Sequence, residues 1–363
     1  MTSHRPLATA ILLLSLGLAG CAATPQAPLP AATPTPSRWA LAIHGGAGVM
    51  DRETMSADTQ AAYRAALQAA LDKGASVLDQ GGSALDAVES VVRGLEDDPL
   101  FNAGRGAVFT AAGRNELDAA IMDGATLKAG AVAGITGTRN PVSLARAVME
   151  KSPHVMLIGA GAETFGQQAG VEQADASWFF TERRWQSLKR TLAERGLPLP
   201  TRPPGVGPEP IPVAAADQMP EDRKFGTVGV VARDRAGHLA AATSTGGTTA
   251  KLWGRVGDVP IIGAGTYAND ESCAVSATGT GEYFIRLGVA REICNLVTYR
   301  GFSLQQAADE VVQKRLTALG GDGGVIAVAP DGTMVWSFNT SGMYRARQSE
   351  GQVPVIGIFK SEP

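Results

Sequence analysis

The chain is poor in the side chains that most often carry enzyme chemistry. Its 363 residues include four histidines and three cysteines, and their spacing does not suggest a metal cluster. A G-x-S-x-G motif is absent, so a serine triad of the hydrolase type is unsupported. The Walker lysine pattern and a regular G-x-G-x-x-G fingerprint are also missing. The glycine-rich segments at 44–48 and 157–166 are therefore expected to allow close backbone approach rather than to bind a nucleotide.

Charge and hydropathy narrow the class of protein further. Only 18% of the residues are charged, the formal net charge is −3, and no block of one sign occurs. Neither nucleic acid nor an anionic membrane surface is therefore an expected partner. The hydrophobic fraction of 44% is that of a globular protein, and the length suits either one large domain or two smaller ones.

The N-terminus carries one apolar run, LATAILLLSLGLAG, which follows Arg5 and is too short to span a bilayer. This pattern predicts a signal peptide over residues 1–20. The run ends in LAGC, which resembles the bacterial lipoprotein signal, where Cys21 would be lipidated and become the mature N-terminus. An ordinary secretory signal followed by a chance cysteine is the alternative. Because Ala22 stands where an aspartate would favour inner-membrane retention, we expect a lipid anchor in the bacterial envelope, at the periplasmic face of the outer membrane.

Two segments are predicted to be tethers or linkers. Residues 21–37 are uncharged and proline-rich, which is typical of an extended tether. Residues 197–224 contain eight prolines without any periodicity, which predicts a mobile linker. Outside the cytoplasm, Cys273 and Cys294 could form a disulfide, but their apolar surroundings equally suit two separate core thiols.

Strands and helices are expected in blocks rather than in βαβ alternation. The segments 227–244 and 324–338 each place a tight turn between two strand-like runs, which is the pattern of a hairpin. This arrangement predicts antiparallel sheets covered by helices, in the α+β class. Further strands are expected at 39–44, 107–110, 117–122, 155–158 and 353–359, and helices at 56–73, 83–95, 141–153, 282–299 and 303–318.

The segment FGTVGVV at 225–231 places Thr227 between the proline-rich linker and a valine-rich strand. A threonine hydroxyl is a weak nucleophile without a base, and a threonine at the start of a strand is in itself ordinary. Cleavage of the Gly226–Thr227 bond would give Thr227 a free α-amine, whose pKa of roughly 7.7–8.0 suits a general base near neutral pH. Gly226 suits such a cut because it tolerates a strained backbone.

The motifs around this threonine resemble those of the plant-type asparaginase/isoaspartyl aminopeptidase family, which are N-terminal nucleophile hydrolases. The resemblance runs in order from about residue 39 to residue 360. It implies a four-layer αββα sandwich, cleaved into an α-subunit (38–226) and a β-subunit (227–363), with two such pairs in an (αβ)2 assembly. The segments that carry it are HGGAG (44–48), LEDDPLFNAGRGAVFT (95–110), ELDAAIMDG (116–124), GTVGVVA (226–232), ATSTGGTTAKLWGRVGDVPIIGAGTYA (242–268), ATGTGEYFIR (277–286), GGDGG (320–324) and FNTSGMYRA (338–346).

The resemblance assigns a role to each catalytic position. Thr227 would be the nucleophile and, once freed, its own base, and Thr245 would tune it. Thr278 and Gly279 would form the oxyanion hole with a hydroxyl and a backbone N–H. Asn102 would help to position Thr227 from the α-subunit.

The resemblance also assigns substrate and ion contacts. Arg255 and Asp258 would hold the substrate's α-carboxylate and α-ammonium, and Gly281 would touch the ammonium through its carbonyl. Opposite charges three residues apart suit a zwitterionic amino-acid head, although a plain local ion pair is the alternative. No cofactor is expected for catalysis. A structural sodium ion would be bound by the backbone carbonyls of Leu95, Glu96, Asp98, Phe101, Ala103 and Arg105, where Arg105 replaces an apolar residue.

The expected activity is hydrolysis of β-aspartyl (isoaspartyl) dipeptides and L-asparagine, with release of L-aspartate through an acyl-enzyme. Both substrates are small molecules that share a side-chain amide and a zwitterionic head. A glycosylasparaginase-like amidase is the nearest enzymatic alternative. An uncleaved, non-catalytic lipoprotein that binds peptides is the alternative from another class.

Overall fold

The computed structural model of the chain describes residues 1–2, 38–208 and 226–363. Almost all of the expected signal peptide, Cys21, the tether at 21–37 and the second half of the linker lie outside the described residues. The first part of the linker, 197–208, contains no helix or strand, as the sequence predicts. Within the described residues, no helix has the length and apolarity needed to cross a bilayer.

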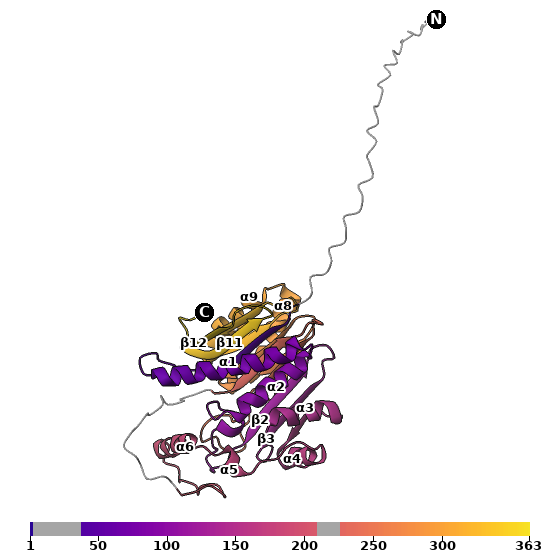
Figure 1. Ribbon diagram of the computed structural model, residues 1–363. Helices are drawn as coiled ribbons and strands as arrows, with labels where there is room; N and C mark the ends of the chain where they lie inside the picture. The colour runs from indigo at the N-terminus through magenta and orange to yellow at the C-terminus, as the bar shows by residue number, and fades with distance from the viewer. Residues whose placement is uncertain (3–37, 209–225) are drawn as a thin grey trace. The chain divides into compact units, whose positions relative to one another are not determined.

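A large sheet of eight strands forms one half of the structure (Figure 1). Its strand order is β12-β11-β1-β5-β6-β2-β3-β4, and every pairing is antiparallel except the one between β3 and β4. The expected β-subunit begins with the strands β5 and β6. These two strands therefore lie at the centre of the large sheet. The bounds are β1 Ala40–Gly48, β2 Leu117–Asp123, β3 Ala129–Ile135, β4 Met156–Ile158, β5 Val228–Arg233, β6 Leu239–Thr245, β11 Gly342–Ser349 and β12 Val355–Phe359.

A second, antiparallel sheet of four strands faces the first, in the order β10-β9-β8-β7. Its strands are β7 Thr266–Asn269, β8 Cys273–Gly279, β9 Gly323–Val328 and β10 Met334–Phe338. Small side chains dominate the layer between the sheets, and they allow the two sheets to approach closely. That layer includes Ala40, Ala42, Ala241, Ala268, Ala274, Ile326 and Met343.

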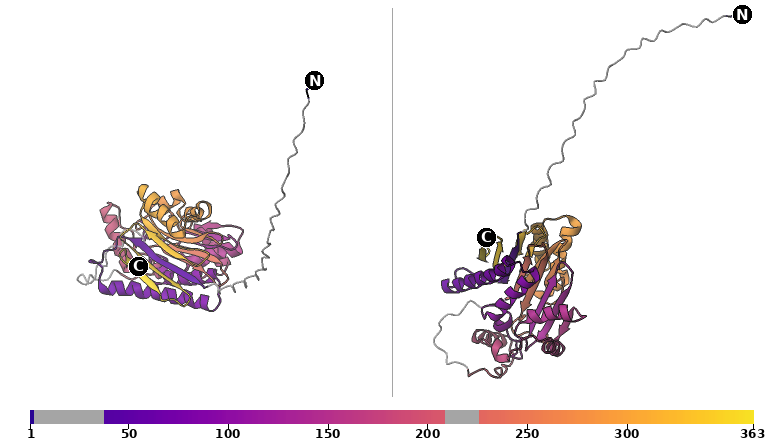
Figure 2. Two further views of the ribbon diagram at one scale, coloured as in Figure 1. Left: turned by 90° about the horizontal axis from the view of Figure 1, so that it is seen from above. Right: turned by 45° about the vertical axis from the view of Figure 1, so that its right-hand side comes forward.

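Helices cover the outer face of each sheet, which makes the architecture an α+β sandwich of four layers. In the left view of Figure 2, the indigo helix α1 and the orange helices α8 and α9 lie on opposite sides of the strands. The helices α1 Ala57–Asp79, α2 Ala84–Asp97 and α3 Pro141–Lys151 pack on the large sheet, whereas α8 Val289–Arg300, α9 Leu304–Asp309 and the π-helix Glu310–Leu316 pack on the small sheet. The remaining helical segments are the 3-10 turn Gly104–Gly106, α4 Gly159–Gln168, α5 Ala176–Phe179, α6 Glu182–Glu194 and α7 Gly281–Leu287.

Local sequence signals explain several element boundaries. Ser83 caps α2 by accepting a hydrogen bond from the N–H of Asp86, as its spacing predicts. The helix expected at 282–299 is interrupted, because Gly288 adopts a left-handed conformation (φ 60°) between α7 and α8. The prediction of a strand at 107–110 is wrong, because these residues are buried but belong to no strand. The glycines at 45–48 do not end β1, which continues through them with a register shift between His44 and Gly46.

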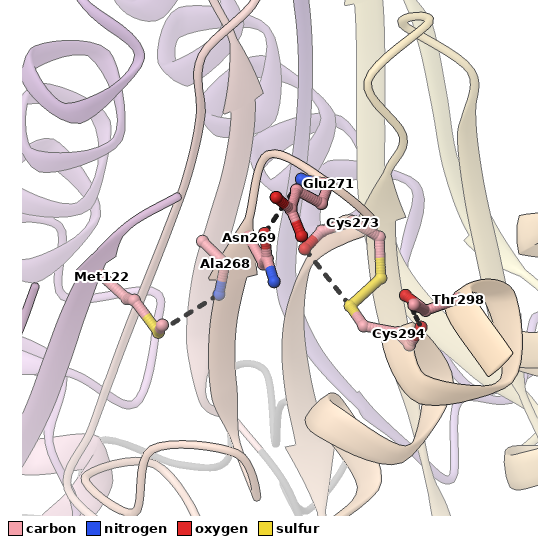
Figure 3. The surroundings of a disulfide bond; sticks show 7 residues. All are labelled: Met122, Ala268, Asn269, Glu271, Cys273, Cys294 and Thr298. Carbon is pink, nitrogen blue, oxygen red and sulfur yellow. Dashed lines mark hydrogen bonds between the residues drawn. A yellow bond between two sulfur atoms is a disulfide. The ribbon is translucent and has the colours of Figure 1, made fainter. Parts of the chain in front are cut away.

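Cys273 and Cys294 form a disulfide, which decides between the two alternatives left open by the sequence (Figure 3). Cys273 begins β8 and Cys294 lies within α8, with their Cα atoms 5.4 Å apart. Both residues are buried. The bond therefore joins the small sheet to the helix layer that covers it.

Candidate active site

Thr227 lies directly before the first residue of β5 and is 8% exposed. Its hydroxyl donates a hydrogen bond to Oγ1 of Thr245, the last residue of β6, across 3.1 Å. The backbone N–H of Gly247 donates to the same Thr245 oxygen at 3.0 Å. Because Thr245 accepts two hydrogen bonds, the two hydroxyls are held in a defined orientation. The structure brings the two threonines together as expected, and their catalytic roles stay predictions.

The bond expected to be cut is held from the other side by Asn102. The carbonyl oxygen of Gly226 accepts a hydrogen bond from the backbone N–H of Asn102 at 3.0 Å. A Cβ on residue 226 would lie 2.5 Å from the Cβ of Asn102, so this close contact requires glycine. The amide side chain of Asn102 donates to the carbonyl of Gly247 at 2.8 Å and accepts from the N–H of Val108 at 2.9 Å. Asn102 thus contacts the scissile peptide by its backbone and orders the neighbouring loops by its side chain.

Arg255, Asp258 and Gly281 come together as the sequence predicts. A Cβ on Gly281 would lie 2.9 Å from both Nη2 of Arg255 and Oδ1 of Asp258. On the opposite side, Nη1 of Arg255 lies 3.6 Å from the position of a Cβ on Gly247. Arg255 therefore connects the turn that follows Thr245 with the start of α7.

Arg255 has a hydrogen-bonded carboxylate partner, whereas Asp258 has an oxygen without a hydrogen-bond partner among the described residues. The guanidinium of Arg255 donates two hydrogen bonds to the carboxylate of the largely exposed Glu282, at 2.9 and 3.0 Å. Asp258 is 4% exposed, and its Oδ2 has no hydrogen-bond partner among the described residues. Burial raises the pKa of Asp258 to about 7. A cationic ligand group beside Asp258 would restore the ionised form of its carboxylate.

The expected oxyanion residues end β8. Thr278 is fully buried, and its Oγ1 lacks a hydrogen-bond partner within the part of the chain that the structure describes. Gly279 is the last residue of the strand, and a Cβ there would lie 2.4 Å from the Phe284 ring. The unpartnered hydroxyl of Thr278 is available to a ligand oxygen, as a donor in an oxyanion hole must be.

Comparisons with known proteins agree with this arrangement. The family model described as asparaginase matches residues 37–358. The chain is 50% identical over 322 residues to the isoaspartyl peptidase of Escherichia coli (strain K12), covering 89% of this chain and 96% of that protein. It is 42% identical to a probable isoaspartyl peptidase/L-asparaginase 2 of Arabidopsis thaliana (89% and 99% covered). It is also 42% identical to a plant-type L-asparaginase of Thermococcus kodakarensis (88% and 99% covered).

The chain belongs to the asparaginase family. Its four layers are the sandwich of the N-terminal nucleophile hydrolases, as the resemblance implied. Small-molecule substrates fit this family.

Sequence reasoning missed two buried charges beside the threonines of this asparaginase-family chain. Asp118 lies opposite Thr245 in the β2–β6 pairing, so both side chains lie on one face of the sheet. Its Oδ1 accepts from the N–H of Gly134 at 2.9 Å, whereas Oδ2 has no partner among the described residues. Lys251, 5% exposed, donates to the carbonyl of Glu116 at 2.9 Å. Charged residues within the apolar runs LDAAIM and TTAKLW were the signal that could have identified them.

These two charges perturb each other. Burial raises the pKa of Asp118, and the positive charge of Lys251 opposes that rise. Burial lowers the pKa of Lys251, and the charge of Asp118 opposes that fall. Nζ of Lys251 lies 3.1 Å from the position of a Cβ on Gly247, next to the turn that follows Thr245. A buried pair of opposite charges therefore flanks the threonine hydroxyls.

The carbonyls expected to bind sodium lie where α2 ends and the next loop turns back. Gly104, at φ +49°, approaches so closely that a Cβ would lie 2.3 Å from the carbonyl oxygen of Glu96. In the same way, a Cβ on Gly106 would lie 2.0 Å from the carbonyl oxygen of Phe101. The side chain of Arg105 is exposed and stacks over Trp178 at 4.9 Å. Two of the expected carbonyls already accept a backbone hydrogen bond, Asp98 from the N–H of Phe101 at 3.3 Å and Ala103 from the N–H of Gly106 at 3.1 Å. Backbone carbonyl oxygens are hard ligands that suit an alkali or alkaline-earth cation.

Proposed function

We propose that this chain is an autoprocessing threonine amidohydrolase that hydrolyses β-aspartyl dipeptides and L-asparagine and releases L-aspartate. The observation that carries the proposal is the geometry at Thr227. Its hydroxyl is hydrogen-bonded to Thr245, and the carbonyl before it is hydrogen-bonded by the N–H of Asn102. A nucleophile and a donor on the neighbouring carbonyl are the two elements that an acyl shift requires.

Maturation would proceed at the Gly226–Thr227 peptide bond. Oγ1 of Thr227 attacks the carbonyl carbon of Gly226, and the negative charge that develops on the oxygen is stabilised by the N–H of Asn102. The C–N bond then breaks, the hydroxyl proton ends on the departing nitrogen, and an ester links Gly226 to Thr227. Water hydrolyses this ester, which leaves a carboxylate on Gly226 and a free α-amine on Thr227.

Substrate hydrolysis would repeat the same chemistry on an external amide. The α-amine of Thr227 takes the proton of Oγ1 while that oxygen attacks the side-chain carbonyl of the substrate. The hydroxyl of Thr278 and the N–H of Gly279 stabilise the oxyanion. The leaving nitrogen takes the proton and departs as ammonia or as the amine of an amino acid. Water then cleaves the β-aspartyl ester and releases L-aspartate.

The charges beside the threonines support recognition of a zwitterionic head. The guanidinium of Arg255 would bind the α-carboxylate in a bidentate manner, sharing its donors with Glu282. The unpartnered Oδ2 of Asp258 and the carbonyl of Gly281 would bind the α-ammonium. Each of these contacts uses an atom common to L-asparagine and β-aspartyl peptides, so one site serves both substrates.

The proposal extends to location and assembly. The LAGC motif supports lipidation of Cys21 and attachment to the bacterial envelope, with the catalytic domain on the periplasmic side. The disulfide between Cys273 and Cys294 agrees with an oxidising compartment. By family analogy, two cleaved αβ pairs would form an (αβ)2 assembly, and sodium would be bound by the carbonyls of the 95–105 loop as a structural ion without a catalytic step.

The test is direct. After purification of the mature protein, denaturing gel electrophoresis should show two fragments, and sequencing of the smaller one should begin TVGVV. β-Asp-Leu and L-asparagine should both release L-aspartate. A single intact chain without hydrolysis of β-Asp-Leu would favour the non-catalytic peptide-binding lipoprotein instead. Faster hydrolysis of glycosylated asparagine than of either substrate would favour the glycosylasparaginase-like alternative.

A further inference from the structure

A chain of four buried polar side chains crosses the interior between the two sheets. It consists of His44 on β1, Ser276 on β8, Thr243 on β6 and Thr266 on β7, and each of them has no solvent exposure. Nε2 of His44 lies 2.9 Å from Oγ of Ser276, that oxygen lies 2.7 Å from Oγ1 of Thr243, and Thr243 in turn lies 2.7 Å from Oγ1 of Thr266. Burial of a polar group costs folding free energy unless the group is hydrogen-bonded. A row of four hydrogen-bonded side chains inside the protein therefore needs an explanation.

One end of the chain contacts the nucleophile. Nδ1 of His44 lies 3.1 Å from the carbonyl oxygen of Thr227. A carbonyl can only accept, so Nδ1 must carry the proton. Burial lowers the pKa of His44 to about 3, so the ring is neutral near pH 7 and its Nε2 is an acceptor.

The direction of every other hydrogen bond follows from this tautomer. Ser276 must donate its hydroxyl proton to Nε2 of His44, and its oxygen then accepts from Thr243. Thr243 accepts from Thr266 in the same way. The hydroxyls are therefore ordered in one direction, toward the carbonyl of Thr227.

Gly229 makes room for this arrangement. A Cβ on residue 229 would lie 1.9 Å from Oγ of Ser276 and 2.3 Å from Nε2 of His44. No side chain fits there while those two atoms remain hydrogen-bonded. The second glycine of the GTVG motif is the second residue of the central strand β5, where glycine is unfavourable, and it thus has a specific steric reason.

Ser276, the second of these four side chains, lies on the strand that carries the expected oxyanion residues. Ser276 precedes Thr278 by two positions on β8, so both side chains lie on the same face of that strand. Oγ1 of Thr266 also lies 3.1 Å from the carbonyl oxygen of Val259, the residue after Asp258, but its one proton is donated to Thr243, so this is a close approach and not a second hydrogen bond. The hydrogen-bonded side chains therefore join the strand that follows Thr227 to the strand that carries the expected oxyanion residues.

We infer that His44, Ser276, Thr243 and Thr266 are positioning residues that set the distance between the Thr227 nucleophile and the oxyanion donors at the end of β8. This inference rests on the proposed function and assigns it a set of residues outside the substrate contacts. The four side chains act through hydrogen bonds on Thr227 and β8, and they do not touch the reacting atoms. A misplacement of about 1 Å in such a site can cost about 10²-fold in rate.

Steady-state kinetics with β-Asp-Leu on the matured full chain tests the inference. Ser276→Ala and Thr243→Val should each lower kcat by about 10- to 100-fold while KM changes by less than about threefold, because Arg255 and Asp258 still bind the substrate head. Thr243→Ser keeps the hydroxyl and should restore kcat to near the unmutated value. Self-cleavage, followed on gels, should slow in the same two variants.

Thr138→Val is the matched control. Thr138 is also fully buried, and its hydroxyl donates to Glu163 at 3.0 Å, away from this chain of side chains. Its thermal midpoint should fall as in the test variants, whereas kcat should not change. A folded Ser276→Ala or Thr243→Val with unchanged kcat would overturn the inference. If neither folds, Ser276→Cys retains volume with a weaker donor, and an unchanged kcat there would overturn it equally.

Failure of this inference can be distinguished from failure of the proposed function by the activity of the unmutated protein. If the unmutated chain is neither cleaved nor active, the proposed function fails and the inference fails with it. If the unmutated chain is active and the variants match it, only the inference fails.

Discussion

The backbone N–H of Asn102 and the carbonyl of Gly226 form a 3.0 Å hydrogen bond that holds the peptide bond proposed for cleavage against the 98–106 loop. The contact depends on the missing side chain of Gly226, because a Cβ there would lie 2.5 Å from that of Asn102. We therefore expect Gly226→Ala to slow self-cleavage strongly, since the carbonyl would move away from its N–H donor. The fraction of intact chain over time on denaturing gels measures this. Gly161→Ala, where nothing lies within 4 Å, is the control, and equal cleavage rates in the two variants would contradict the role of the contact.

Removal of the nucleophile should separate folding from maturation. Thr227→Ala is expected to fold, to remain a single chain and to be inactive, because no hydroxyl is present to attack Gly226. Thr245→Val should fold and mature slowly, since the Thr227 hydroxyl loses its 3.1 Å partner. Gel analysis and thermal melting of both variants provide the measurement. Normal cleavage of Thr227→Ala would rule out this residue as the nucleophile.

Substitution of the substrate-binding guanidinium should affect binding and leave maturation intact. Arg255→Ala should be cleaved at Gly226–Thr227, because within the described residues the hydrogen bonds of its guanidinium go to Glu282 and not to this peptide bond. Its KM for L-asparagine should rise by at least about tenfold, since a charged hydrogen bond contributes about 1.5–3 kcal/mol. The exposed Arg300→Ala serves as control. An unchanged KM in Arg255→Ala would reject the assignment.

Acid pH should weaken substrate binding through Asp258. Its pKa of about 7 means that the carboxyl is neutral below that pH and cannot attract the substrate ammonium, whereas above it the ionised form is restored. The α-amine of Thr227 must also be neutral for catalysis, and an unperturbed α-amine has a pKa of roughly 7.7–8.0. A plot of log kcat/KM against pH should thus approach a slope of about 2 on the acid side, because two groups titrate there.

Asp258→Asn provides the comparison for this profile. Only one titrating group would remain, so its residual activity should show an acid slope of about 1. A slope of about 1 in the unmutated enzyme would mean that Asp258 does not control binding.

Removal of sodium should lower stability if the 95–105 loop binds the ion. Exchange of sodium for tetramethylammonium at constant ionic strength should reduce the thermal midpoint, because an ion present at 100 times its Kd stabilises by about 2.7 kcal/mol. Among the described residues there is no cluster of three or more His, Cys, Asp or Glu side chains suited to a metal, so a carbonyl site is the one that this experiment addresses. Identical midpoints in both salts would argue against the sodium site.

Much of the fold could be predicted because its determinants are local. The hairpins β5–β6 and β9–β10 carry turn residues between two strand-like apolar runs, and Ser83 caps the start of α2. The 107–110 segment was misread because buried loop residues and a strand share the same apolar composition. β3, α4 and α6 were not predicted. The sequences of β3 and α4 are rich in glycine and have weak periodicity. In α6, Trp185, Leu188 and Leu192 do follow helical spacing, and the sequence analysis overlooked this signal.

Some features of the candidate site were also expected from the sequence, whereas others were not. Thr227, Thr245, Arg255, Asp258 and Thr278 lie in motifs that can be read along the chain, and the family resemblance of these motifs placed them in one site. The structure shows the contact between Thr227 and Thr245 and the approach of Arg255 and Asp258 to Gly281. The sequence could not reveal that Cys273 and Cys294 pair, since a spacing of 21 residues fits both pairing and separation.

The sequence by itself determined that a threonine between a glycine and a buried strand is the candidate nucleophile and that the chain is built from antiparallel hairpins and covering helices. Only the tertiary structure decided how His44, Ser276, Thr243 and Thr266 meet, why Gly229 has no side chain and how Asn102 reaches Gly226. The physical reason is that turns, caps and periodicity act over a few residues. The direction of a buried hydrogen bond depends on strands that are distant in sequence and adjacent in space.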